Sequence, residues 1–263
     1  MNTSPETATE PAFHLTDDQI AAFRRDGYLV VPGLFSPDDM ARIAAWTEEL
    51  AHWPERPGSI WMYFEQSLTE PRRRLLNRIE NFCAHHEGFR KLVNSPRIMQ
   101  PLADLFGEPA VLFKDKINFK MAGGDGFKAH QDVQAGWDRY ASLHITALVS
   151  IDAATCENGC LEMAPGHHDR GLIGRPWEPL SDADLEGIEF VPCETQPGDV
   201  VFFDSFAPHR SGPNHSSAWR RVLYLTYNRL SEGEHLAQYY ADKHASYPPD
   251  CERDPGRDYR FRV

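Results

Sequence analysis

The stretch after Gly107 breaks into short apolar runs separated by turn residues, and this pattern limits the possible folds more than any other feature. The separating turns are rich in glycine, proline and aspartate. Short strands at this spacing are typical of a β-sandwich or a β-barrel. The apolar runs cover residues 111–113, 117–119, 143–151, 200–203 and 222–227. We therefore expect residues 107–263 to form a mainly β core.

The N-terminal half carries helical signals instead. Thr16 and Ser36 each stand before a segment with apolar residues at helical spacing, as N-cap residues do. Between these two expected helices, residues 28–31 are predicted to form a short strand. Residues 72–106 are predicted to be helical, because apolar side chains recur at helical spacing at Leu75, Leu76, Ile79 and Phe82.

These patterns predict a single domain over residues 1–263, of mixed α/β class with a mainly β core. Residues 13–106 would form its helix-rich part. Residues 1–12 are polar and rich in threonine, glutamate and proline, so we expect them to be disordered.

The formal net charge of −12 argues against nucleic acid and anionic membranes as partners, because both repel an acidic protein. The N-terminus lacks the features of a signal peptide, and no apolar run approaches the roughly 20 residues of a membrane span. The five cysteines form neither a disulfide framework nor a zinc-site spacing. We expect a cytoplasmic protein with reduced thiols that acts on a small molecule and binds neither nucleic acid nor membrane.

His130 and Asp132 lie two positions apart in the segment 127–133. On a strand, both side chains would point to the same side and reach one ion. The apolar run 200–204 is followed by His209, which supplies a third ligand. Two imidazoles and one carboxylate on one face of an octahedral ion form the facial triad of non-haem Fe(II) oxygenases. We therefore predict an Fe(II) site with three positions open for a 2-oxo acid and O2.

A lone His-x-Asp motif also fits a hydrogen-bonded pair on the surface, so the residues beyond His209 matter. Arg220 lies eleven residues after His209, at the start of an apolar strand. A guanidinium binds a carboxylate through two parallel hydrogen bonds, which suits the far carboxylate of 2-oxoglutarate. Ser211 can donate to the same carboxylate. Two other classes stay open, a zinc metallohydrolase and a non-catalytic cupin-like binding protein, although a hydrolase has no use for Arg220.

Several stretches together resemble the phytanoyl-CoA dioxygenase (PhyH) family over most of residues 15–230. In chain order they are Asp26-Gly-Tyr-Leu-Val-Val-Pro-Gly-Leu-Phe35, His130-Gln-Asp132, Asn158-Gly-Cys-Leu161, Pro165-Gly-His167, Pro197-Gly-Asp199, His209-Arg-Ser-Gly-Pro-Asn214 and Arg220-Arg221. The resemblance implies a double-stranded β-helix (jelly-roll) barrel with N-terminal and flanking helices. It also implies an Fe(2+) cofactor held by the three predicted ligands, O2, and 2-oxoglutarate bound by Arg220 and Ser211. Family halogenases carry a small residue in place of the carboxylate, so Asp132 favours hydroxylation.

Polar residues alternate along the segment before the metal ligands, at Lys114, Lys116, Asn118 and Lys120. Period two places them on one strand face. The other face would carry Phe113, Ile117 and Phe119. The polar face either lines the barrel, where it suits an anionic substrate or 2-oxoglutarate, or faces solvent.

The loop 134–140 follows the first two ligands and is expected near the metal. Its Trp137 and Tyr140 would form part of a cage for a substituted ammonium group, assisted by Asp138, or they would serve packing alone. The predicted substrate-binding residues are Lys116, Asn118, Lys120, Gln131, Trp137, Asp138 and Tyr140.

An anion-binding face beside an ammonium-binding loop suits a small zwitterion. The chain is also similar to bacterial PhyH-family members that hydroxylate 2-aminoethylphosphonate or its N-methylated relatives at the carbon next to phosphorus. The segments 116–120 and 247–259 contribute to this similarity. Hydroxylation of an acyl-CoA, another lipid or an amino acid derivative stays open, as does the oligomeric state.

Overall fold

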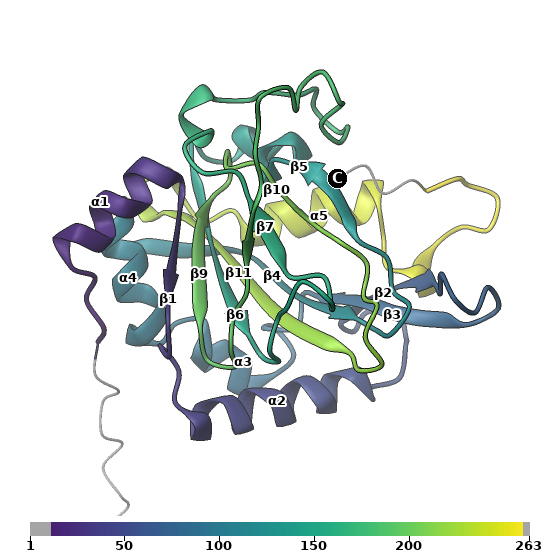
Figure 1. Cartoon of the computed structure of the whole chain (residues 1–263). Helices are drawn as coiled ribbons and strands as arrows, with labels where there is room; N and C mark the ends of the chain where they lie inside the picture. The colour runs from purple at the N-terminus through teal and green to yellow at the C-terminus, as the bar shows by residue number, and fades with distance from the viewer. Residues whose placement is uncertain (1–11, 260–263) are drawn as a thin grey trace, which may run out of the picture.

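The computed structural model describes residues 12–259, and it builds two antiparallel sheets that face each other (Figure 1). The larger sheet has the order β1 (Tyr28–Val31), β9 (Val200–Asp204), β6 (His144–Ser150), β11 (Arg220–Arg229), β4 (Ala110–Lys120), β3 (Arg74–Glu80) and β2 (Trp61–Gln66). The smaller sheet has the order β5 (Phe127–His130), β10 (His209–Ser211), β7 (Leu161–Met163) and β8 (Val191–Cys193). The predicted jelly-roll core is confirmed. The disorder expected for residues 1–12 concerns positions that, except for the exposed Ala12, lie outside the described residues.

Apolar side chains of both sheets meet between them. Leu148 and Phe203 of the larger sheet belong to the same buried cluster as Leu161 and Met163 of the smaller one. Each such side chain contributes about 1.5–3 kcal/mol when it is fully buried. This packing fixes the distance between the sheets, and it brings strand β10 with His209 over the face of the large sheet.

Helices cover the other face of the large sheet. They are α1 (Asp17–Asp26), α2 (Pro37–Ala51), α3 (Glu87–Leu92) and α4 (Pro96–Phe106), and α5 (Leu236–Ser246) follows the last strand. Ile43, Ile98 and Leu102 join Ile117 and Leu223 in one buried cluster between these helices and the sheet. Single-turn 3₁₀ helices complete the chain: η1 (Asp132–Ala135), η2 (Trp137–Arg139), η3 (His168–Arg170), η4 (Leu230–Glu232) and η5 (Asp250–Glu252). Within the described residues, no helix has the length and apolar character to cross a bilayer.

The predicted starts of the first two helices are confirmed. The side chains of Thr16 and Ser36 accept hydrogen bonds from the backbone N–H groups of Gln19 and Asp39, and those residues reciprocate. Each capping box satisfies two otherwise unpaired donors, so both helix starts are encoded locally.

The helix predicted over residues 72–106 is wrong in its first part. Residues 74–80 form strand β3, which lies between β2 and β4, and only 87–92 and 96–106 are helical. Leu75 and Ile79 fit a helical period, yet both are buried within the sheet. Pairing with two neighbouring strands outweighed the weak local preference, which a sequence period alone does not reveal. The N-terminal part therefore adds β1, β2 and β3 to the same sheet as the later strands.

Strand β4 contains a bulge that changes one predicted side-chain direction. Lys114 pairs with Thr226 and Leu112 pairs with Tyr227, so Phe113 is the extra residue. Phe113 consequently packs against Trp137 and Tyr239 rather than with Ile117. The expectation that Phe113 shares a face with Ile117 and Phe119 is wrong, because one inserted residue reverses the alternation.

Candidate active site

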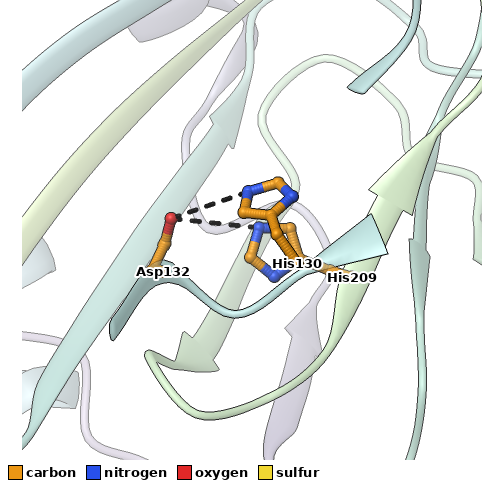
Figure 2. Close-up of side chains that lie close together, drawn as sticks. All are labelled: His130, Asp132 and His209. Atoms are coloured by element: carbon orange, nitrogen blue, oxygen red, sulfur yellow. Dashed lines mark ion pairs between the residues drawn. The ribbon is translucent and has the colours of Figure 1, made fainter. Parts of the chain in front are cut away.

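His130 and His209 face one another across the smaller sheet as paired residues of β5 and β10. Asp132 Oδ1 lies 3.9 Å from His130 Nε2 and 4.0 Å from His209 Nε2. Figure 2 shows the carboxylate directed at both imidazoles. One donor atom from each residue lies within 4.8 Å of the others, so a single ion can contact all three.

Asp132 reaches this position in a different way from the one expected. Strand β5 ends at His130, and Asp132 is the first residue of η1. The chain turns immediately after Gln131, so the carboxylate comes from a turn and not from strand alternation. The two-residue spacing still brings both ligands to one ion.

The histidine side chains are oriented by backbone carbonyls. His130 Nδ1 is 2.7 Å from the carbonyl oxygen of Lys128, and His209 Nδ1 is 3.0 Å from that of Ala207. A carbonyl only accepts, so Nδ1 carries the proton and Nε2 presents its lone pair to the common centre. Burial lowers the pKa of His130 to about 3 and also lowers that of His209. Both rings are therefore neutral at pH 7, as metal ligands must be.

Arg220 and Ser211 lie together at one end of the interior. Arg220 is cross-strand partner to Lys120 on β4, and Lys120 Nζ donates to Ser211 Oγ at 2.8 Å. Tyr224, further along β11, interacts with Arg220 and Asn118. Burial, followed by the charge of Arg220, lowers the pKa of Lys120 to about 7. This end of the interior therefore holds two adjacent basic side chains.

The Arg220 guanidinium is suited to a carboxylate that the chain itself does not supply. Arg220 is 2% exposed, and no carboxylate of residues 12–259 forms an ion pair with it. Its Nε has no hydrogen-bond partner among those residues. A buried cation without a counter-charge is costly, and a bound dicarboxylate would remove that cost. The residues present therefore fit 2-oxoglutarate.

The polar face of β4 lines the interior and not the solvent, which resolves the two alternatives left by the sequence. Asn118 and Lys120 are buried near Arg220. The ammonium nitrogen of Lys116 lies 4.3 Å from the centre of the Tyr224 ring. Burial raises the pKa of Asp132, but the interactions with His209 and then with Lys116 outweigh it, and the pKa is lowered. Lys116 thus lies beside the metal ligands.

The loop residues predicted to hold an ammonium group are placed differently from one another. Trp137 is buried, and the ammonium nitrogen of Lys114 lies 5.2 Å from its ring centre. Tyr140 is half-buried and its hydroxyl donates to Asp242 at 2.6 Å. Asp138 is exposed. The structure therefore does not gather these three side chains into one cage, and it places a cation of the protein over the Trp137 ring.

Gln131 points away from the metal ligands although it stands between two of them. Its amide nitrogen donates to the carbonyl oxygens of Gly171 and Phe206 at 2.8 and 2.7 Å. Its amide oxygen accepts from the backbone of Ile173 at 2.8 Å. These bonds use the polar atoms of the side chain, so Gln131 ties two loops together and has no group left for a substrate.

Sequence reasoning missed a second charged group in the interior. Arg78 and Glu80 lie on β3 beside Asn118 and Lys116, and Lys243 of α5 forms an ion pair with Glu80. The alternation Arg-x-Glu was a usable signal, but the helical interpretation of this segment hid it. No sequence pattern connects Lys243 with β3, because helix α5 packs there only in the folded chain.

Two cavities lie in this part of the molecule, and the first includes a metal ligand in its lining. One of about 360 Å³ is lined by His130, Arg78, Tyr63 and Tyr247 among others. The second, of about 390 Å³, is lined by Lys114, Trp137, Tyr239, Lys243 and Tyr247 among others. These sizes suit a small substrate.

Comparison with known proteins agrees with this site. The family model described as phytanoyl-CoA dioxygenase (PhyH) matches residues 23–222. The chain is 40% identical to a 2-aminoethylphosphonate dioxygenase from an uncultured bacterium, covering 94% of each chain. It is also 40% identical to a methylphosphonate hydroxylase from Gimesia maris, covering 89% of this chain and 88% of that one.

A solved structure supports the fold. The crystal structure of EctD from S. alaskensis with 2-oxoglutarate and 5-hydroxyectoine matches with a TM-score of 0.69 at 24% identity, over 83% of this chain and 77% of that chain. With the triad geometry and the relatives above, these findings make the protein an Fe(II)- and 2-oxoglutarate-dependent dioxygenase. The chain belongs to the phytanoyl-CoA dioxygenase (PhyH) family.

Proposed function

We propose that the protein hydroxylates the carbon bonded to phosphorus in a small phosphonate, with 2-aminoethylphosphonate or an N-methylated analogue as its substrate. The relatives at 40% identity are named for 2-aminoethylphosphonate and for methylphosphonate. These two molecules share only a phosphonate group and the carbon attached to it. Methylphosphonate has no other carbon to hydroxylate, so a common reaction places the new hydroxyl there.

The observation that carries this proposal is the number of basic side chains that the strands and α5 bring into the interior. Arg220 and Lys120 are cross-strand partners on β11 and β4, and a second group, Arg78, Lys114 and Lys243, surrounds Glu80. An anionic co-substrate and an anionic substrate together require cations in two places. A long acyl chain would require an apolar groove, and the charged residues of both cavities oppose one.

The residues have separate roles in this mechanism. His130, Asp132 and His209 would hold Fe(II), and Arg220 with Ser211 would grip and orient 2-oxoglutarate. When metal, 2-oxoglutarate and O2 are bound, they supply the oxidation: one oxygen atom enters the substrate C–H bond, and the other enters succinate as CO2 leaves. The carbonyls of Lys128 and Ala207 keep both imidazoles in the tautomer that presents Nε2. The ring of Trp137 walls one cavity and helps to exclude water.

The test is to incubate the purified protein with Fe(II), 2-oxoglutarate and O2, with and without 2-aminoethylphosphonate or methylphosphonate. We expect succinate in proportion to substrate, and a 1-hydroxylated phosphonate in equal amount by phosphorus NMR. If neither phosphonate raises succinate above the uncoupled background, the proposed substrate class is wrong.

A further inference from the structure

Four charged side chains gather where β3, β4 and α5 meet, around the buried Glu80. Arg78 and Glu80 come from β3, Lys114 from β4 and Lys243 from α5. Glu80 is fully buried, forms an ion pair with Lys243, and lies 3.2 Å from Arg78 Nε. On formal charges, three cations stand against one carboxylate, which leaves two positive charges.

Lys114 shares the charge of Glu80 with two other cations and has no close ion pair of its own among the described residues. No residue in the described range 12–259 forms an ion pair with its ammonium group or accepts a hydrogen bond from it. Its ammonium nitrogen lies over the ring faces of Trp137, at 5.2 Å, and Tyr239, at 5.6 Å. The residue is half-buried and lines the cavity of about 390 Å³. Ring faces replace lost hydration only in part, so this position favours an anion.

The position of Lys114 also separates it from the co-substrate. Six residues along β4 divide it from Lys120, which is about 20 Å at the rise of a strand. That distance exceeds the length of 2-oxoglutarate, so its two carboxylates cannot serve both ends. Between the two ends lies Lys116, whose charge acts on Asp132. The anion that meets Lys114 is therefore a separate molecule, adjacent to the metal ligands.

The contact between Lys114 and the Trp137 ring also indicates that an anion binds at this position. A substituted ammonium group of a substrate would need this face, and Lys114 already occupies it. A second cation at the same ring would be repelled. This end of the interior thus favours the anionic part of a zwitterion over its ammonium group.

We propose that Lys114, with Arg78 and Lys243 beside it, forms the subsite for the phosphonate group of the substrate and so sets the carbon next to phosphorus at the metal. The inference rests on the proposed function for the identity of the anion. Two net positive charges complement a fully ionised phosphonate. The charge of Lys114 also acts on Asp132, so a phosphonate held here would lie in the neighbourhood of the metal ligands.

Lys114→Gln tests the subsite, because this substitution removes the charge without breaking an ion pair. The Fe(II)- and 2-oxoglutarate-loaded protein is titrated calorimetrically with methylphosphonate in the absence of oxygen. We expect binding to weaken about tenfold to a hundredfold, the range for a lost charge-assisted contact. Lys114→Arg should restore most of the affinity, and 2-oxoglutarate affinity should not change in either variant. Lys91→Gln, at an exposed lysine of α3, is the matched control.

Steady-state kinetics supply the second readout: KM for the phosphonate should rise in Lys114→Gln while kcat stays within a few-fold of the wild type. Unchanged methylphosphonate affinity in Lys114→Gln would overturn the subsite. If the wild type turns over no phosphonate, the proposed function fails, and inorganic phosphate becomes the probe. If Lys114→Gln then binds phosphate more weakly than the wild type, the subsite is supported. If the two proteins bind phosphate equally, or neither binds it, the subsite is rejected.

Discussion

His130 and His209 are cross-strand partners whose ring centres lie 4.3 Å apart, so the edge strand β5 and its neighbour β10 meet at the metal ligands. Each ring is held by a carbonyl two residues earlier in its own strand or turn. The pair is therefore oriented before a metal arrives, and Asp132 completes it from the following turn.

Asp132→Ala should weaken Fe(II) binding by about a hundredfold or more and abolish succinate formation, because the only anionic ligand is lost. Fe(II) binding is measured anaerobically by equilibrium dialysis, and turnover by succinate release. Asp138→Ala, six residues further and exposed, serves as the control and should leave both quantities unchanged. Normal Fe(II) affinity in Asp132→Ala would reject the triad.

Arg220→Ala should raise KM for 2-oxoglutarate about tenfold to a hundredfold, because the bidentate grip on its distal carboxylate is lost. Arg220→Lys should recover little, since an ammonium cannot form the two parallel bonds. The neighbouring Arg221 pairs with Asp152 and Glu48 and provides the comparison. Arg221→Ala should leave KM unchanged, and an equal rise in both alanine variants would remove Arg220 from the co-substrate site.

Gln131→Ala should lower the free energy of unfolding by about 3 kcal/mol, because three buried hydrogen bonds at about 1 kcal/mol each are lost. Urea denaturation of the metal-free protein measures this change. Among the described residues, the exposed side chain of Gln238 bonds to Asp242 alone, so Gln238→Ala should change stability by less than about 0.5 kcal/mol. Similar values for the two variants would show that Gln131 does not tie the loops.

His144 should make the protein sensitive to acid. Burial lowers the pKa of this histidine from 6.5 to about 4, and its Nε2 has no hydrogen-bond partner among the described residues. The unfolded chain takes up a proton near pH 6.5 and the folded chain only near pH 4, so stability falls as the pH drops through this window. The loss attributable to His144 is about 3 kcal/mol at most.

The measurement compares urea unfolding of metal-free wild type and His144→Gln from pH 7.5 to 4.5. The wild type should lose more stability over this range, since His130 and His209 titrate equally in both proteins and cancel. His215→Gln, at an exposed position, should follow the wild type. Parallel curves for wild type and His144→Gln would contradict the prediction.

The sequence alone determined the features that depend on neighbours in the chain. The capping boxes at Thr16 and Ser36 and the strands after Gly107 follow from local hydrogen bonding and local periodicity. The sequence also determined that His130 and Asp132 lie close together. Asp132 is in a turn and not on the expected strand, but residues two positions apart are near each other in either conformation.

Only the tertiary structure decided which distant residues share the interior. Residues 74–80 carry a helix-like apolar period, and they became a strand through pairing with β2 and β4. That pairing placed Glu80 where Lys243 of α5 meets it, and a bulge at Phe113 changed which side chains accompany Lys114. Periodicity reports the faces of one element, whereas the free energy that selects these contacts comes from packing between elements far apart in the chain.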